Sequence, residues 1–261
     1  FTQRTANQRK VLRYGFRPGN PTVAIGDPIV RRNGVDPDQP QTTLEVPSPA
    51  VLVKLIEKWE EQRKGARVLL VIDVSGSMGE PAGNGTKLDL AKQAAITALE
   101  QFKADDQVGL RIFSTNVNTK EPSDYLDLVP IAPLGSVREQ MVSRISSLIP
   151  REGTPLYTVA RASYDELKKN FDPARINAVI LLTDGKNEDP RNDDLNGLIS
   201  ALRSGSEGLS SSPVRLFTIA YGDKAEIDTL KRMAEATNAA SYDASDPTTI
   251  DKVFTAVVSN F

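Results

Sequence analysis

The sequence predicts an α/β fold in which helices cover both faces of a mostly parallel β-sheet. Short apolar runs alternate along the chain with segments whose apolar residues recur at helical spacing, which is typical of such folds. The run 68–72, VLLVI, is continuously apolar, as expected for a strand that is buried on both faces. The chain has 261 residues and is 39% hydrophobic, so it can bury one substantial core. We therefore expect a doubly wound sheet of six strands.

Residues 1–65 are predicted to form an N-terminal extension rather than a second domain. Residues 1–17 are basic and indicate one short helix, whereas residues 18–50 are proline-rich and indicate a largely irregular segment. A helix with an apolar stripe then follows. Because the extension has too few apolar residues for a core of its own, we expect this helix to pack against the main domain. The stripe consists of Val51, Leu52, Leu55, Ile56 and Trp59.

Residues 66–261 are predicted to form the main domain, with strands and helices in alternation. The segment 125–131 is expected to be an antiparallel edge strand, because Pro130 and Pro133 are tolerated at an edge but not inside a sheet. The strands are expected at 68–72, 108–113, 125–131, 176–183, 214–220 and 240–242. The helical stripes lie within 88–102, 137–148, 156–167, 195–202, 227–234 and 250–257.

Three oxygen-bearing side chains follow the first strand at a spacing of two, namely Asp73, Ser75 and Ser77. Gly76 and Gly79 allow the backbone to turn sharply there. The three side chains can then converge at the carboxyl end of the strand, which is where open α/β sheets bind ligands. Short polar residues after a strand also form turns that cap the next helix, and these three residues alone leave both interpretations open.

Two distant segments extend this pattern. Thr154, in the sequence Gly-Thr-Pro-Leu, opens one helical stripe, and Asp184 closes the strand 176–183. Together with Asp73-x-Ser75-x-Ser77, they resemble the D-x-S-x-S, T, D pattern of von Willebrand factor type A (VWA) domains, and no position is missing. The resemblance covers about residues 66–261. It implies a Rossmann-like sheet with one antiparallel edge strand, and a metal-ion-dependent adhesion site (MIDAS). The ligands of that site, acting directly or through water, would be Asp73, Ser75, Ser77, Thr154 and Asp184.

The composition narrows the possible chemistry. The chain has no His and no Cys, which excludes Ser-His-Asp and Cys-His catalysis, imidazole or thiolate zinc sites, and disulfides. Two carboxylates and three hydroxyls suit an octahedral Mg²⁺ site, near ~2.1 Å, with Mn²⁺ as a substitute; Ca²⁺ is possible but prefers more carboxylates. The net charge of −2 gives no field that would attract nucleic acid or an anionic membrane.

The resemblance implies a metal-dependent protein-binding module for adhesion or interaction, in which an Asp or Glu of a protein partner completes the metal coordination. Phosphoryl transferases of the haloacid dehalogenase kind also place an Asp after the first strand of a doubly wound sheet, in a D-x-D-x-T motif. Their second Asp is a general acid, and Ser75 stands in its place here, so we expect no enzymatic activity. The alternative is an intracellular scaffold that cooperates with an AAA-type ATPase or chelatase, as in some bacterial relatives of the family.

A second resemblance concerns the location of the protein. Residues 15–59, with GFRPGNP, GDPI and VLVKLIEKWE, resemble the C-terminal end of bacterial extracellular solute-binding proteins. We therefore expect an extracellular, cell-surface or periplasmic location, with the cytoplasm as the alternative. The sequence begins with Phe1, so we expect it to be a processed or excised piece of a longer chain. No apolar run is long enough to insert into a membrane.

Two further polar segments have simpler interpretations. Residues 83–87, GNGTK, resemble a phosphate-binding loop but do not meet the G-x-x-x-x-G-K-[ST] pattern, so we interpret them as a flexible loop at the rim of the site. The acidic residues after Asp184 either tune the approach of a partner or solvate a loop, and we favour the interpretation that they solvate a loop. They are Glu188, Asp189, Asp193 and Asp194.

Overall fold

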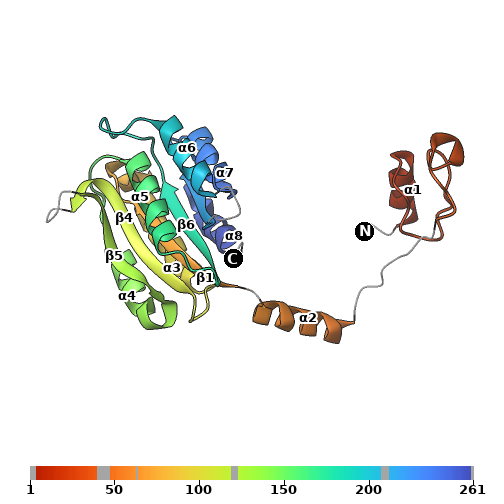
Figure 1. Ribbon diagram of the computed structural model, residues 1–261, viewed down its shortest axis with the longest axis horizontal. Helices are drawn as coiled ribbons and strands as arrows, with labels where there is room; N and C mark the ends of the chain where they lie inside the picture. The colour runs from red at the N-terminus through yellow and green to blue at the C-terminus, as the bar shows by residue number, and fades with distance from the viewer. Residues whose placement is uncertain (1–3, 40–47, 63, 119–122, 207–211, 260–261) are drawn as a thin grey trace. The chain divides into compact units, whose positions relative to one another are not determined.

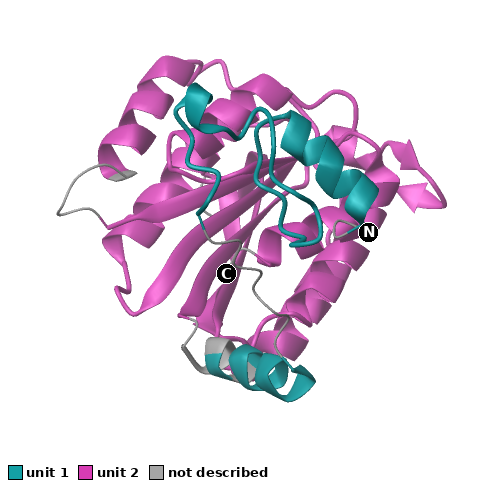
Figure 2. Ribbon diagram, turned by 90° about the vertical axis from the view of Figure 1, so that its right-hand side faces the viewer, with its two compact units in different colours: residues 1–62 teal, residues 63–261 magenta. Residues whose placement is uncertain are grey.

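The structure is a computed structural model that describes residues 4–39, 48–62, 64–118, 123–206 and 212–259. The chain divides into two compact units, residues 1–62 and residues 63–261, which are coloured separately in Figure 2. Each unit is described by itself below. Within the described ranges, no helix is long and apolar enough to cross a membrane.

Unit 1 contains helix α1 (Thr5–Arg13), the 3-10 helix η1 (Arg31–Asn33) and helix α2 (Pro49–Gln62). Proline at the first position of α2 suits a helix start, because the amide that proline lacks has no partner inside the helix there. The apolar stripe of α2 is exposed at Val51, Leu52, Leu55 and Ile56. The side chain of Trp59 lies outside the described residues. The packing of this helix against the main domain stays a prediction.

The described part of unit 2 is built around a six-stranded sheet with the order β5-β4-β1-β6-β7-β8. Strand β5 at one edge is antiparallel to β4, and every other neighbouring pair is parallel. The predicted fold class, including the antiparallel edge strand, is therefore confirmed (Figure 1). The strands are β1 (Gly65–Asp73), β4 (Gln107–Asn118), β5 (Ser123–Pro133), β6 (Arg175–Thr183), β7 (Val214–Tyr221) and β8 (Ser241–Ala244).

Helices pack on both faces of the sheet because the central strand β1 is apolar on both faces. Its residues Val68, Leu70 and Ile72 belong to one core cluster, and Leu69 and Val71 belong to the other. The first cluster includes α3 (Lys87–Leu99), α4 (Leu134–Ser146) and α8 (Ile250–Val258). The second cluster includes α5 (Leu156–Lys169), α6 (Leu195–Ser206) and α7 (Ile227–Glu235).

The segment between β1 and α3 is more ordered than a flexible loop. The 3-10 helix η2 (Gly76–Gly79) is followed by a hairpin of two short antiparallel strands, β2 (Pro81–Ala82) and β3 (Gly85–Thr86). Gly83 and Asn84 form its two-residue turn, and the positive φ of +54° at Gly83 is a backbone conformation that favours glycine. The predicted flexible rim loop at 83–87 is thus a hairpin strand leading into a helix.

A buried arginine ties the antiparallel edge to the helix layer. The guanidinium of Arg111 on β4 donates to both carboxylate oxygens of Asp127 on β5, at 2.7 and 2.9 Å. It also contacts Glu166 and Ser163 on α5, and it lies 4.2 Å from the ring centre of Tyr125. A buried charge is tolerated only with such pairing.

Candidate metal centre

Strand β1 delivers Asp73 to the carboxyl edge of the sheet, next to the end of β6. Asp73 is fully buried, and its two carboxylate oxygens accept hydrogen bonds from the amide of Ser75 at 2.7 Å and the hydroxyl of Thr183 at 2.5 Å. Burial raises the pKa of Asp73 to about 7, although both hydrogen bonds act to lower it. Asp73 is therefore a carboxyl group that takes up or releases a proton near neutral pH.

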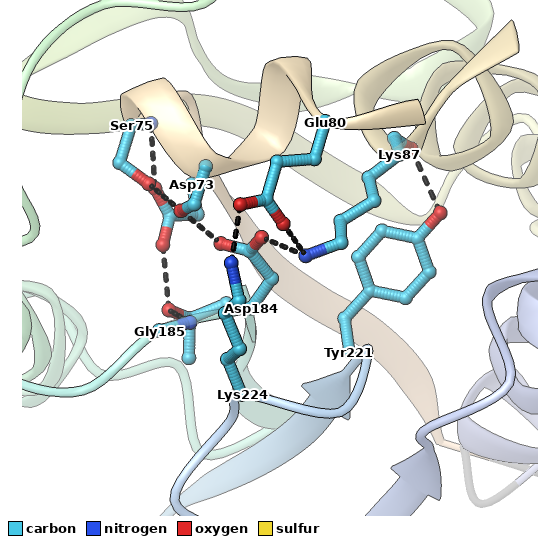
Figure 3. A network of polar contacts seen from close by, with 10 residues as sticks. Asp73, Ser75, Glu80, Lys87, Asp184, Gly185, Tyr221 and Lys224 are labelled. Carbon is cyan, nitrogen blue, oxygen red and sulfur yellow. Dashed lines mark hydrogen bonds and ion pairs between the residues drawn. The ribbon is translucent and has the colours of Figure 1, made fainter. Parts of the chain in front are cut away.

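Ser75, Ser77 and Asp184 form a continuous hydrogen-bonded set. The hydroxyl of Ser77 donates to Oδ1 of Asp184 at 2.7 Å, and the hydroxyl oxygens of Ser75 and Ser77 are 3.1 Å apart. Because Ser77 uses its single proton on Asp184, Ser75 is the donor to Ser77. Ser75 and Asp184 are buried and Ser77 is half-buried. Residues from the ends of β1 and β6 thus meet at one point (Figure 3).

Thr154 reaches the same edge from the loop before α5. Its side chain is buried, and a Cβ added at Gly185 would come within 3.3 Å of its Oγ1. The carbonyl of Thr154 accepts a hydrogen bond of 2.9 Å from the amide of Glu188. The structure thus places Thr154 beside the residue that follows Asp184 and fastens the two loops together.

Sequence reasoning missed Lys87, which is part of the same site. Its ammonium nitrogen lies 2.8 Å from Oδ2 of Asp184 and 2.9 Å from an oxygen of Glu80, and Lys224 pairs with the other oxygen of Glu80 (Figure 3). Lys87 is buried although it is charged. Desolvation acts to lower the pKa of Lys87, but the hydrogen bonds from its ammonium group to Asp184 and Glu80 outweigh it and raise the pKa. Hydrogen bonds from Lys224 and Lys87 lower the pKa of Glu80 to about 2.

A local signal for the position of Lys87 was present in the sequence. Thr86 is the N-cap of α3, and Thr86 and Asp89 form a capping box, with each side chain accepting from the other residue's backbone amide. The spacing of a threonine and an acidic residue three positions later marks a helix start. This pattern places Lys87 at the first position of the helix.

The backbone around Lys87 is shaped to receive it. The hydroxyl of Tyr221 donates to the carbonyl of Lys87 at 2.8 Å. Gly222 has φ +75°, and a Cβ at that position would stand 3.2 Å from Cε of Lys87. Glycine therefore provides both the backbone conformation and the room that the lysine stem requires.

A second polar network braces the loop after β6. Asp189 is buried and binds both the guanidinium of Arg191 at 2.9 Å and the hydroxyl of Thr158 on α5 at 3.1 Å. Arg191 also pairs with Asp124 at the start of β5. Burial acts to raise the pKa of Asp189, but the hydrogen bonds from Arg191 and Thr158 outweigh it and lower the pKa. The interpretation of Asp189 as a solvating residue was wrong.

The amino-acid sequence of unit 2 matches that of one known protein family over most of its length. Residues 68–256 match the family described as von Willebrand factor type A domain. The chain belongs to this family. VWA domains are typically metal-dependent interaction modules.

Two known proteins resemble the chain at modest identity. It is 29% identical over 175 residues to inter-alpha-trypsin inhibitor heavy chain H2 of Sus scrofa, covering 64% of this chain and 17% of that protein. It is 29% identical over 132 residues to the protein YwmD of Bacillus subtilis, covering 48% of this chain and 58% of YwmD. The chain thus spans less than two thirds of the length of either relative.

One solved structure with the same fold has an occupied metal site. It is proximal thread matrix protein 1 from the mussel byssus, described with a zinc-occupied MIDAS motif. Its TM-score is 0.59 at 16% identity, and the match covers 75% of this chain and 48% of that protein. At this identity the similarity concerns the fold alone.

The donors at the edge of β1 and β6 suit a hard cation. Within the described residues, no group of three or more His, Cys, Asp and Glu side chains could hold a metal. The oxygen donors brought together are instead two carboxylates, Asp73 and Asp184, and the hydroxyls of Ser75 and Ser77. Such a mixed set of oxygen atoms fits Mg²⁺ or Mn²⁺, which accept hydroxyl and water ligands beside one or two carboxylates.

Proposed function

We propose that this VWA domain is a metal-dependent protein-binding module that holds a divalent cation, with Mg²⁺ as the expected metal. We propose that a carboxylate of a protein partner completes the coordination of this cation. The metal would be held at a MIDAS formed by Asp73, Ser75, Ser77, Thr154 and Asp184, directly or through water. The observation that carries the proposal is the hydrogen-bonded set of Ser75, Ser77 and Asp184 beside the buried Asp73.

The charges of these residues support a binding role. Asp73 and Asp184 contribute two negative charges at most, and the hydroxyls contribute none. A dication held by this set would keep Lewis acidity, which favours a further anionic ligand from outside. The residues of the chain hold and orient the cation, and the loops that contain Ser77, Thr154 and Asp184 form the rim on which a partner would lie.

The composition and the site favour binding over catalysis. The chain has no His, and Ser75 occupies the position where a metal-dependent phosphoryl transferase would carry its acidic proton donor. Lys87, whose ammonium nitrogen lies 2.8 Å from Oδ2 of Asp184 (Figure 3), is paired on both sides with carboxylates and is buried. We therefore propose a non-enzymatic function.

We propose a cell-surface, periplasmic or extracellular location. The support is the resemblance of residues 15–59 to the end of bacterial extracellular solute-binding proteins. Fractionation of cells that express the protein from its natural gene would test the location. Recovery in the cytoplasm, together with an AAA-type ATPase, would favour the alternative of an intracellular scaffold.

The experiment that tests the function is a pull-down in Mg²⁺ and in EDTA with matched serine variants. Ser75→Ala removes a hydroxyl of the site, and Ser200→Ala removes an exposed hydroxyl on α6 as the control. A partner should be captured by the wild type and the control in Mg²⁺, and lost in EDTA and with Ser75→Ala. Asp or Glu to amide changes in that partner should abolish binding as thoroughly. Equal capture in EDTA and by Ser75→Ala would overturn the proposal.

A further inference from the structure

The two carboxylate oxygens of Asp184 have different partners. Oδ1 accepts from the hydroxyl of Ser77 at 2.7 Å, and Oδ2 lies 2.8 Å from the ammonium nitrogen of Lys87 (Figure 3). Asp184 itself is fully buried. One oxygen therefore lies beside the serine hydroxyls of the proposed metal site, and the other is occupied by a positive charge of the protein.

The position of Lys87 is held from several directions. Its side chain is 5% exposed, and burying an ammonium group is unfavourable unless it is paired. Glu80 contacts it opposite Asp184, and Lys224 pairs with the other oxygen of Glu80. The backbone carbonyl of Lys87 accepts from Tyr221, and the lysine stem passes close to Gly222. The ammonium group is thus fixed in place.

From this arrangement we infer that Lys87 is a positioning residue that sets the affinity and the selectivity of the metal site. It holds Asp184 so that a single oxygen faces the serine hydroxyls, and it offsets one of the two negative charges of the site. The inference rests on the proposed function, since it concerns the same metal site.

The first consequence concerns affinity. Without metal, Lys87 already balances the buried charge of Asp184, so the fold does not require a cation at this point. A bound dication must share Asp184 with an ammonium group of the same sign, which weakens its binding. The site therefore binds metal weakly and reversibly, and a carboxylate from a partner offsets the excess positive charge.

The second consequence concerns selectivity. Ca²⁺ takes six to eight oxygen ligands and often uses both oxygens of one carboxylate, whereas Mg²⁺ is octahedral and takes few carboxylates. Because Lys87 occupies Oδ2, Asp184 can offer a metal only Oδ1. Lys87 therefore disfavours Ca²⁺ more than it disfavours Mg²⁺.

The test uses three variants of the full chain and titration calorimetry with MgCl₂ and CaCl₂. Lys87→Met keeps the length of the side chain and removes its charge. It should raise Mg²⁺ affinity by about tenfold, which is about 1.4 kcal/mol, and raise Ca²⁺ affinity more. Glu80→Gln removes one of the two negative charges that pair with the ammonium group of Lys87. The positive charge of Lys87 then repels a bound cation more strongly, so Mg²⁺ affinity should fall. The control is Lys224→Met, which removes an exposed charge that pairs with Glu80, and it should change Mg²⁺ affinity by less than about twofold.

Opposite shifts for Lys87→Met and Glu80→Gln separate the inference from a merely structural role. Both variants break the same ion pair, so structural damage alone would weaken metal binding in both. The Lys87→Met variant should also melt at a lower temperature than the wild type in EDTA, because Asp184 then has no positively charged partner. Added Mg²⁺ should restore its melting temperature, because the cation takes the place of the ammonium group. Where Lys87→Met does not fold, Lys87→Gln removes the charge and keeps a donor for Asp184.

The outcomes distinguish a failure of the role of Lys87 from a failure of the proposed metal-dependent function. If the wild type binds Mg²⁺ and Lys87→Met and Lys87→Gln bind it no more tightly, the role of Lys87 is refuted and the metal site stands. If the wild type binds no divalent cation, the proposed function fails and the role of Lys87 fails with it.

Discussion

The buried carboxyl of Asp73 makes stability in the absence of metal depend on pH in a predictable direction. Burial raises the pKa of Asp73 from 3.8 to about 7. The folded protein therefore keeps a proton on this group between about pH 4 and pH 7, whereas the unfolded chain releases it. The contribution of the protonated Asp73 to the free energy of unfolding is fully present below about pH 4 and is lost as the pH rises through about 7. A tenfold change in proton affinity is about 1.4 kcal/mol, so the loss amounts to about 4 kcal/mol at most.

The perturbation that isolates this effect is Asp73→Asn, which keeps the shape of the side chain and removes its titration. Other carboxylates, such as Glu80 with its lowered pKa, titrate equally in both proteins and cancel in the difference. We expect the free energy of unfolding of the variant, relative to the wild type, to be greater at pH 8 than at pH 5. Urea denaturation in EDTA, followed by circular dichroism at both pH values, measures this change.

Added Mg²⁺ should act on the wild type in the opposite direction. The cation requires the charged form of Asp73, so it restores stability at pH 8, and its affinity should fall as the pH drops below about 7. Asp73→Asn should gain little from Mg²⁺ at either pH. A stability difference between wild type and variant that is the same at pH 5 and pH 8 would show that the pKa of Asp73 is not raised in the folded protein.

Three further predictions concern other parts of the chain. Arg111→Met should lower the free energy of unfolding by about 1.5–3 kcal/mol in urea denaturation, because it removes a buried guanidinium that is hydrogen-bonded to the partly exposed carboxylates of Asp127 and Glu166. The exposed pair of Arg161 serves as the control, and Arg161→Met should cost less than about 1 kcal/mol. Equal effects would contradict this. Gly222→Ala should lower stability by about 1–3 kcal/mol, because its φ is +75° and the added Cβ meets Lys87. An unchanged melting temperature would refute it. Deletion of residues 1–64 should lower solubility or melting temperature, and an equally stable monomer would show that the segment is a linker.

The sequence predicted most of the sheet because its signals are local. The apolar run at 68–72 became the centre of β1, buried on both faces, and the prolines near 125–133 marked the antiparallel edge strand. The oxygen-bearing residues Asp73, Ser75 and Ser77 lie within one turn of backbone, so their proximity follows from spacing. The meeting with Asp184 was expected only from the resemblance to VWA domains, and it agrees with the rule that parallel strands end at the same edge of a sheet.

The partners of Lys87 could not be predicted in the same way. Lys87 and Asp184 are 97 positions apart, and Glu80 and Lys224 are 144 positions apart. Such pairs depend on which loops meet after folding, and no periodicity in the sequence encodes them. The hydrogen bond between Asp189 and Thr158 of helix α5 is of the same kind, since the sequence alone does not show that an acidic loop residue is buried and hydrogen-bonded.

Binding of a divalent cation at the edge of β1 and β6 can be measured by calorimetric titration of three proteins. MgCl₂ is titrated into the wild type, into Asp184→Asn, and into Asp193→Asn, which removes an exposed carboxylate in the following loop as the control. We expect a single site in the wild type and in Asp193→Asn, and no measurable site in Asp184→Asn. Equal Mg²⁺ binding by all three proteins would contradict this expectation.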